Sequence, residues 1–233
     1  MLSALSGNFR KMVLFTSLIL VHELGHFLTA CFFHWKVDKI VLYPYGGCSY
    51  FEVDVNTSIL EEFFVLIMGP IFQIIFTCIL FFFLRESDAS FLLLVSQLLL
   101  FFNFLPIYPL DGGKLFLLIM SFFFSYYQSL KITFYSSFFF YFLLLFVAFL
   151  LYQSLFWLLL LFTLFFRLWK EQKNGNYLYQ KFLLERYLNS YSFRKEKIVT
   201  SVFSMKKGYS HLFLEKGKCI GEEEYLKKYF LLT

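Results

Sequence analysis

Apolar runs long enough to cross a lipid bilayer recur along the first three quarters of the sequence. A membrane-spanning helix needs about 20 predominantly apolar residues, and the first such run covers residues 12–35. Further runs cover residues 63–84, 91–127, 132–152 and 154–169, and the third of these is interrupted at 103–113. The sequence therefore predicts a mainly α-helical, polytopic membrane domain of about five spans, one of them broken.

The composition and the charge distribution agree with a membrane protein. Of the 233 residues, 59% are hydrophobic and 16% are charged, whereas an average soluble chain has about 25% charged residues. This composition excludes a disordered chain and a water-soluble fold. Of the 21 Lys and Arg residues, 14 lie after residue 166. The positive-inside rule therefore predicts a cytosolic C-terminus, and it explains the basic tail more simply than direct nucleic-acid binding does.

Two stretches outside the spans predict other structure. Residues 37–41 and 48–55 have strand-like composition around a turn signal at 43–47, which predicts a short hairpin or re-entrant loop. This loop either pairs with an extended substrate by strand addition or is a plain connector. Residues 176–233 predict a small α+β appendage in the order strand, helix, two strands, helix, separate from a membrane domain at 1–175. In that appendage we expect His211 on a strand surface, and Lys206 and Lys207 in water or among lipid headgroups.

Three ionisable residues, His22, Glu23 and His26, lie inside the first apolar run. Ionisable groups at membrane depth are energetically costly and usually functional. His22 and His26 are four residues apart and project from one helix face, so they can share one Zn²⁺ while Glu23 reaches a water molecule. Two alternatives are histidines bonded to polar groups of other helices, and a metal-transport pathway, which would repeat its ligands along several helices.

A catalytic zinc ion with two histidines needs one more protein ligand. Asp111 follows the break at Pro106 and Pro109 and precedes two glycines, where irregular backbone is allowed only beside a cavity or within protein. Asp111 is therefore either the third ligand or the cap of a helix that restarts at residue 114 or 115.

The residues His22-Glu23-Leu24-Gly25-His26 in a span, together with Asn103-x-x-Pro106-x-x-Pro109-Leu110-Asp111-Gly112-Gly113, resemble the site-2 protease family of intramembrane zinc metalloproteases. Residues 43–47, 61–70 and 181–187 are similar as well. The resemblance implies that His22, His26 and Asp111 bind Zn²⁺, that Glu23 is the general base and that Asn103 helps to hold the substrate. The alternative role of Asn103 is to satisfy backbone carbonyls freed by Pro106.

The resemblance also implies a reaction and partners. Within the family, the chain is similar to a protease of endospore formers that cleaves a membrane-associated sigma-factor precursor. The resemblance implies inhibitory membrane proteins as partners and a place in the bacterial cell membrane or the forespore outer membrane. Because the appendage is small, it is expected to lean on a partner, on a second copy in a homo-oligomer or on the membrane domain. Residues after 197 resemble a single CBS motif, which implies ATP or another adenine nucleotide. Family members usually have another span before the zinc motif, whereas only residues 1–11 precede it here, so we expect either a start site that is assigned too late or a shortened natural form. The alternative function is a catalytically silent membrane scaffold.

Overall fold

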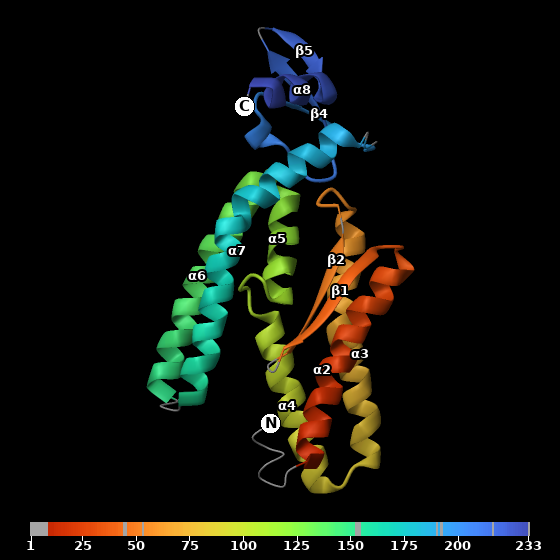
Figure 1. Ribbon diagram of the computed structural model, residues 1–233, viewed down its shortest axis with the longest axis vertical. Helices are drawn as coiled ribbons and strands as arrows, with labels where there is room; N and C mark the ends of the chain where they lie inside the picture. Colours follow the sequence, from red (N-terminus) through yellow and green to blue (C-terminus); the bar gives the residue numbers. More distant parts are fainter. Residues whose placement is uncertain are drawn as a thin grey trace. The chain divides into compact units, whose positions relative to one another are not determined.

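The computed structural model of the chain forms two compact units (Figure 1). It describes residues 9–43, 46–52, 54–151, 155–189, 191, 193–215 and 217–232. Unit 1 comprises Met1–Val53 and Leu60–Phe104, and unit 2 comprises Asp54–Ile59 and Leu105–Thr233. Each unit is described by itself below.

Unit 1 combines three long helices with a β-hairpin. The helices are α2 (Phe9–Phe32), α3 (Ile59–Phe83) and α4 (Glu86–Phe104). Strands β1 (Lys36–Tyr43) and β2 (Gly46–Glu52) pair antiparallel, and both contact α2 (Figure 1). The predicted hairpin is therefore confirmed, although residues 44 and 45 of its turn lie outside the described residues.

Unit 2 consists of three helices followed by the appendage. The helices are α5 (Asp111–Phe123), α6 (Tyr126–Leu151) and α7 (Leu155–Leu188). The appendage contains β3 (Glu196–Val199), the 3₁₀ helix η1 (Val202–Ser204), β4 (Ser210–Glu215), β5 (Lys218–Gly221) and α8 (Glu222–Leu232). Strand β3 pairs parallel with β4, which pairs antiparallel with β5. The predicted order of strand, helix, two strands and helix is thus observed.

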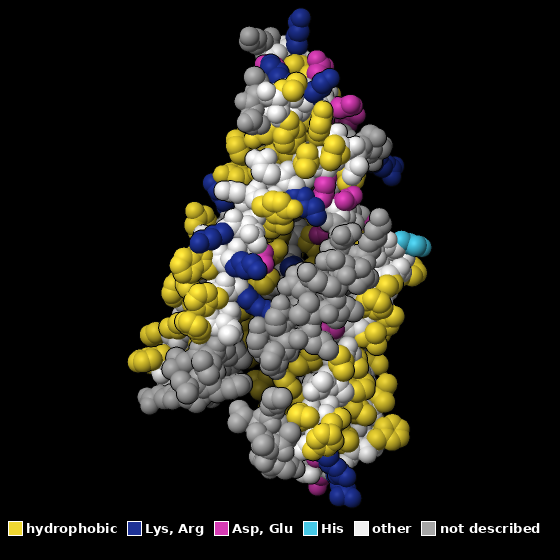
Figure 2. Space-filling model, viewed as in Figure 1, with side chains coloured by type: hydrophobic (Ala, Val, Ile, Leu, Met, Phe, Trp, Pro, Cys, Tyr) yellow, Lys and Arg dark blue, Asp and Glu magenta, His cyan; other side chains and the backbone are white. Residues whose placement is uncertain are grey.

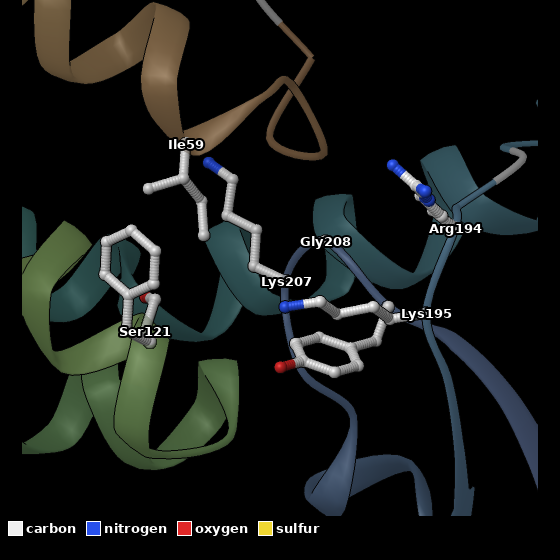
Figure 3. Close-up of a pocket in the computed structure, with 8 residues that line it drawn as sticks. Ile59, Ser121, Arg194, Lys195, Lys207 and Gly208 are labelled. Atoms are coloured by element: carbon white, nitrogen blue, oxygen red, sulfur yellow. The ribbon is translucent and has the colours of Figure 1, made fainter.

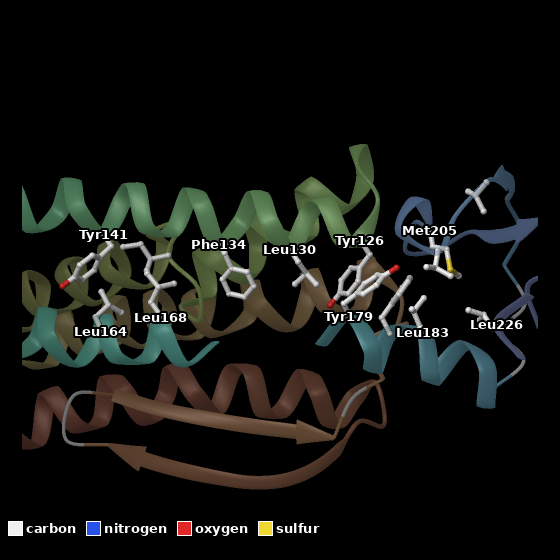
Figure 4. Close-up of a cluster of buried hydrophobic side chains, with 14 of the residues drawn as sticks. Tyr126, Leu130, Phe134, Tyr141, Leu164, Leu168, Tyr179, Leu183, Met205 and Leu226 are labelled. Atoms are coloured by element: carbon white, nitrogen blue, oxygen red, sulfur yellow. The ribbon is translucent and has the colours of Figure 1, made fainter. Parts of the chain in front are cut away.

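One hydrophobic core runs along α6 and α7 and continues into the appendage (Figure 4). Its buried members on α6 include Tyr126, Leu130, Phe134 and Tyr141, and those on α7 include Leu164, Leu168, Tyr179 and Leu183. Met205 and Leu226 extend the same cluster into the appendage. Because this core is continuous, the appendage folds against the helices of unit 2.

Four helices among the described residues are long and apolar enough to cross a membrane, namely Phe9–Phe32, Ile59–Phe83, Glu86–Phe104 and Tyr126–Leu150. Figure 2 shows hydrophobic side chains over much of the visible surface, and Lys and Arg side chains mainly in the middle and upper parts of the view, with a further group at the lower end. The predicted third span is split into α4 and α5 by the expected break. The fifth predicted run lies mostly in α7, which continues without interruption to Leu188.

The predicted domain boundary at 175/176 therefore falls inside a helix. Helix α7 continues through Gly175. The glycine lies close to α6, since an added Cβ would be 2.9 Å from the ring of Phe134. The division into residues 1–175 and 176–233 stays a prediction.

A buried polar network joins the appendage to the end of α7. The side chain of Arg186 is 1% exposed. Its Nε donates to Oδ1 of Asn56 (2.6 Å), and its Nη1 donates to Oε1 of Glu222 (2.9 Å) and to the carbonyl of Tyr209 (2.8 Å). The third guanidinium nitrogen, Nη2, donates to the carbonyl of Lys206 at 3.1 Å. This arginine therefore fixes the loop before β4.

His211 belongs to the same network, so its predicted place on a strand surface is wrong. It is 2% exposed, and its Nε2 accepts the backbone N–H of Lys206 at 2.9 Å. Its Nδ1 therefore carries the hydrogen and donates to Oε2 of Glu222 at 3.2 Å. Burial lowers the pKa of His211, although the bond to Glu222 opposes this shift.

Candidate metal centre

Helix α2 presents two buried imidazoles from one face, as the four-residue spacing predicts. His22 and His26 are 2% and 6% exposed. Their Nε2 atoms lie 3.1 Å apart, and their rings are nearly perpendicular, with centroids 4.8 Å apart. The two side chains therefore converge on one point.

The hydrogen-bond partner of Nδ1 in each histidine shows whether that nitrogen carries a hydrogen atom. Nδ1 of His26 lies 2.7 Å from the backbone carbonyl of Val65, which can only accept. Nδ1 of His22 lies 2.9 Å from Oε1 of Gln73. The amide nitrogen of Gln73 donates to the carbonyl and hydroxyl oxygens of Ser96, which assigns Oε1 to the His22 side. Both histidines therefore carry hydrogen on Nδ1, and in the neutral form of each ring Nε2 has the lone pair.

These two imidazoles fit a zinc ion. Two nitrogen atoms that each hold a lone pair cannot hydrogen-bond to each other across 3.1 Å, so this arrangement suits a cation that both nitrogens bind. Tetrahedral zinc with Zn–N bonds of about 2.0–2.1 Å separates two such nitrogens by about 3.3 Å. Zinc-binding histidines typically donate their other ring N–H to a fixed acceptor, because this hydrogen bond orients the ring.

Two glycines provide the space in which the imidazoles lie. A Cβ on Gly69 of α3 would be 2.3 Å from Nε2 of His26. A Cβ on Gly25 of α2 would be 2.5 Å from the carbonyl oxygen of Met68. Helices α2 and α3 therefore approach closely beside the histidines, and a larger residue at either position would displace a ring or separate the helices.

Asn103 approaches the histidine pair from α4, whereas Glu23 is next to His22 in the sequence of α2. Asn103 lies near the end of α4, and its Nδ2 is 3.2 Å from Nε2 of His22, where it can donate to the lone pair. Glu23 follows His22 directly on α2 and is partly buried. At the break itself, the hydroxyl of Ser137 on α6 accepts the backbone N–H of Tyr108 at 2.9 Å.

Asp111 lies in unit 2, as the first residue of α5. The helix begins there and not at residue 114 or 115, and its N-cap is Leu110, with no side-chain capping bond. The capping role considered for Asp111 is therefore not observed. The Asp111 side chain is 14% exposed, with Nζ of Lys114 at 4.0 Å. Gly113 allows this first turn to pack on Ile107 and Tyr108, because its Cβ would lie 2.4 Å from the Tyr108 nitrogen.

The structure thus brings His22, His26 and Asn103 together within unit 1 and places Asp111 on unit 2. Sequence reasoning missed Gln73, which is fully buried and holds His22. It also missed Ser96 and Thr77, whose hydroxyls lie 2.9 Å apart behind Gln73. The available signal was the presence of uncharged polar residues inside apolar runs, where each needs a hydrogen-bond partner.

Comparisons with known proteins agree with these observations. The model of peptidase family M50 matches residues 11–89, which include the histidine pair. Stage IV sporulation protein FB of Bacillus subtilis is 30% identical over 98% of this chain and 87% of its own length. A zinc metalloprotease of Methanocaldococcus jannaschii is 32% identical over 52% of this chain and 37% of its own length.

A solved structure supports the same relationship. The site-2 protease from Methanocaldococcus jannaschii superposes with a TM-score of 0.54 at 25% identity, covering 69% of this chain and 76% of that one. Sequence and structure thus lead to one group of proteins. The chain belongs to peptidase family M50, the site-2 protease family of membrane metalloproteases.

Proposed function

We propose that this protein is a zinc-dependent intramembrane endopeptidase in which His22, His26 and Asp111 bind the metal. The observation that carries the proposal is the histidine pair of unit 1, whose Nε2 atoms lie 3.1 Å apart while both Nδ1 atoms have acceptors. Asp111 supplies the carboxylate that completes three protein ligands. Zinc supplies a charge that polarises a peptide carbonyl and makes water acidic enough to react at neutral pH.

The residues of the chain provide the remaining steps. Glu23 accepts a proton from the attacking water and returns a proton to the leaving amine. Asn103, whose amide lies 3.2 Å from His22, donates a hydrogen bond to the backbone of the bound substrate. Buried apolar surroundings strengthen both interactions, because few water molecules compete with them.

The substrate is proposed to be a membrane-associated precursor, bound in extended form. The hairpin β1–β2 supports this proposal, because both strands contact α2, the helix that carries the histidines. In the described residues this sheet has two strands, each paired on one side, so a substrate strand can add to an edge. The likeness to Stage IV sporulation protein FB favours a sporulation sigma-factor precursor as the substrate.

Further proposals concern the surroundings of the enzyme. The excess of Lys and Arg after residue 166 favours a cytosolic C-terminus in a bacterial cell membrane or forespore outer membrane. Inhibitory membrane proteins and a second copy of the chain are the proposed partners. The observed order β3–η1–β4–β5–α8 supports a regulatory appendage of CBS type. A thermal shift of the full-length protein on adding ATP would test nucleotide binding there, and an unchanged melting temperature would refute it.

Zinc content and cleavage together test the main proposal. Purified wild-type protein should hold about one zinc per chain, and His26→Ala and Asp111→Asn should each lose it. Glu23→Gln should keep the zinc but abolish cleavage of a co-expressed, membrane-tethered precursor. A folded wild-type protein without zinc would overturn the proposal, and a Glu23→Gln variant with full activity would exclude Glu23 as the base. A silent scaffold would bind its partners equally well with or without this substitution.

A further inference from the structure

A cavity of about 230 Å³ lies in unit 2, and none of the proposed zinc ligands lines it (Figure 3). It is bounded by the last turns of α5 and by the segments just before β3 and β4. Its lining includes Ser121, Phe122, Arg194, Lys195, Lys207 and Tyr209. Three of the lining side chains are cationic, and none of the described residues that line the cavity is acidic. The cavity therefore favours an anion.

The wall that carries Lys207 is held rigidly. Lys207 is 3% exposed, and Figure 3 shows its side chain reaching toward Ile59. The preceding residue, Lys206, donates its backbone N–H to His211 and its Nζ to the carbonyl of Phe123 at 2.6 Å. Arg186 binds the carbonyls on both sides of Lys207, those of Lys206 and Tyr209. The loop is thus fixed in place before any ligand arrives.

Two further cations come from the segment directly before β3. In Figure 3 the side chain of Lys195 extends toward the loop that carries Lys207 and Gly208, and its Nζ lies 5.8 Å from the ring of Tyr209. The carbonyl of Lys195 accepts the backbone N–H of Ser210 at 2.9 Å, which ties this segment to the Lys207 loop. Arg194 and Lys195 are both exposed, so they can exchange water for a ligand.

The residues beside this cavity are of the types that are common at a membrane–water interface. Phe122, Phe123 and Phe124 at the end of α5 are 54%, 67% and 42% exposed. The candidate span Tyr126–Leu150 begins directly afterwards, and in its first turns Nζ of Lys131 lies 4.4 Å from the ring centroid of Tyr127. Aromatic and basic residues at the start of a span are typical of the headgroup region.

We propose that this cavity binds a phosphate group, namely the phosphate of an anionic lipid headgroup. The guanidinium group of Arg194 suits the oxygens of a phosphate, and the two lysines add point charges. Free phosphate in solution has the same chemistry. The exposed phenylalanines beside the cavity favour the lipid, because acyl chains can cover them while the headgroup enters the cavity. This proposal does not depend on the metal centre or on proteolysis.

The test is lipid retention by the full-length protein. Native mass spectrometry would titrate detergent-purified protein with phosphatidylglycerol and, in parallel, with phosphatidylcholine. The variant Arg194→Gln/Lys195→Gln should bind phosphatidylglycerol about 30-fold more weakly, since each cation near a membrane surface contributes roughly fivefold. The matched control Lys218→Gln/Lys227→Gln removes the same charge from exposed positions of the appendage that do not line the cavity, and it should bind as the wild type does.

A second arm separates the two sources of phosphate. Inorganic phosphate at millimolar concentration would be added to the lipid-free protein while its melting temperature is measured. No shift, together with selective retention of phosphatidylglycerol, supports the headgroup. A shift that the Arg194→Gln/Lys195→Gln variant loses supports phosphate binding from solution and refutes the lipid as the source. Equal lipid loss in the variant and the control, or no loss in either, overturns the proposal.

Discussion

Replacing Gln73 with leucine tests whether a buried amide orients His22, a proposed zinc ligand. Gln73 is fully buried, and it accepts from Nδ1 of His22 at 2.9 Å while it donates to Ser96 at 3.0 and 3.1 Å. Leucine has a similar volume but no polar atom, so the Nδ1–H of His22 would lose this acceptor. Loss of a residue that hydrogen-bonds to a metal ligand lowers the metal affinity by about 10- to 100-fold, or ~1.4–2.7 kcal/mol.

The assay is a competition titration of zinc against a chromophoric chelator in detergent. Gln97→Leu makes the same chemical change at an exposed position of α4 and should leave the zinc affinity unchanged. A melting curve of each variant shows whether the fold is kept. If folded Gln73→Leu protein binds zinc as tightly as the wild type, then Gln73 does not position His22, and the tautomer assigned to that ring loses its basis.

Three other outcomes follow from the packing and charges. Gly69→Ala should abolish zinc binding measured by metal analysis, because the new Cβ would lie 2.3 Å from Nε2 of His26; zinc at the wild-type level would contradict this. Arg186→Met should destabilise the full chain by about 3–5 kcal/mol in a denaturation experiment, because Glu222 loses its buried partner; an unchanged unfolding midpoint would count against the network. The protein should lose stability as the pH falls below about 6.5, because the unfolded chain protonates His211 at its ordinary pKa while the folded state, with its lowered pKa, resists the proton. Melting temperatures between pH 7.5 and 5.5 measure this loss, and an equally steep profile in His211→Asn would disprove the assignment.

The histidine pair could be predicted from sequence because a four-residue spacing fixes which side chains share a helix face. The break before Asp111 could be predicted because Pro106 and Pro109 cannot continue a helix. Gln73 could not be assigned to His22, since the pairing of residues on different helices depends on packing.

One error in the C-terminal part concerns His211. It was expected at the surface of a strand, but it is buried, and its Nε2 accepts the backbone N–H of Lys206. Local sequence patterns do not show which distant groups need a hydrogen bond.

Helix α5 connects two features described separately above. Its first residue is Asp111, and the carbonyl of its last residue, Phe123, accepts Nζ of Lys206 from the appendage. Over 13 residues this helix acts as a stiff rod, whose two ends are about 18 Å apart. A displacement of the loop at Lys206 would act on the end of α5 opposite to Asp111. A partner that binds the appendage would therefore reach the helix of a proposed metal ligand without contacting that ligand.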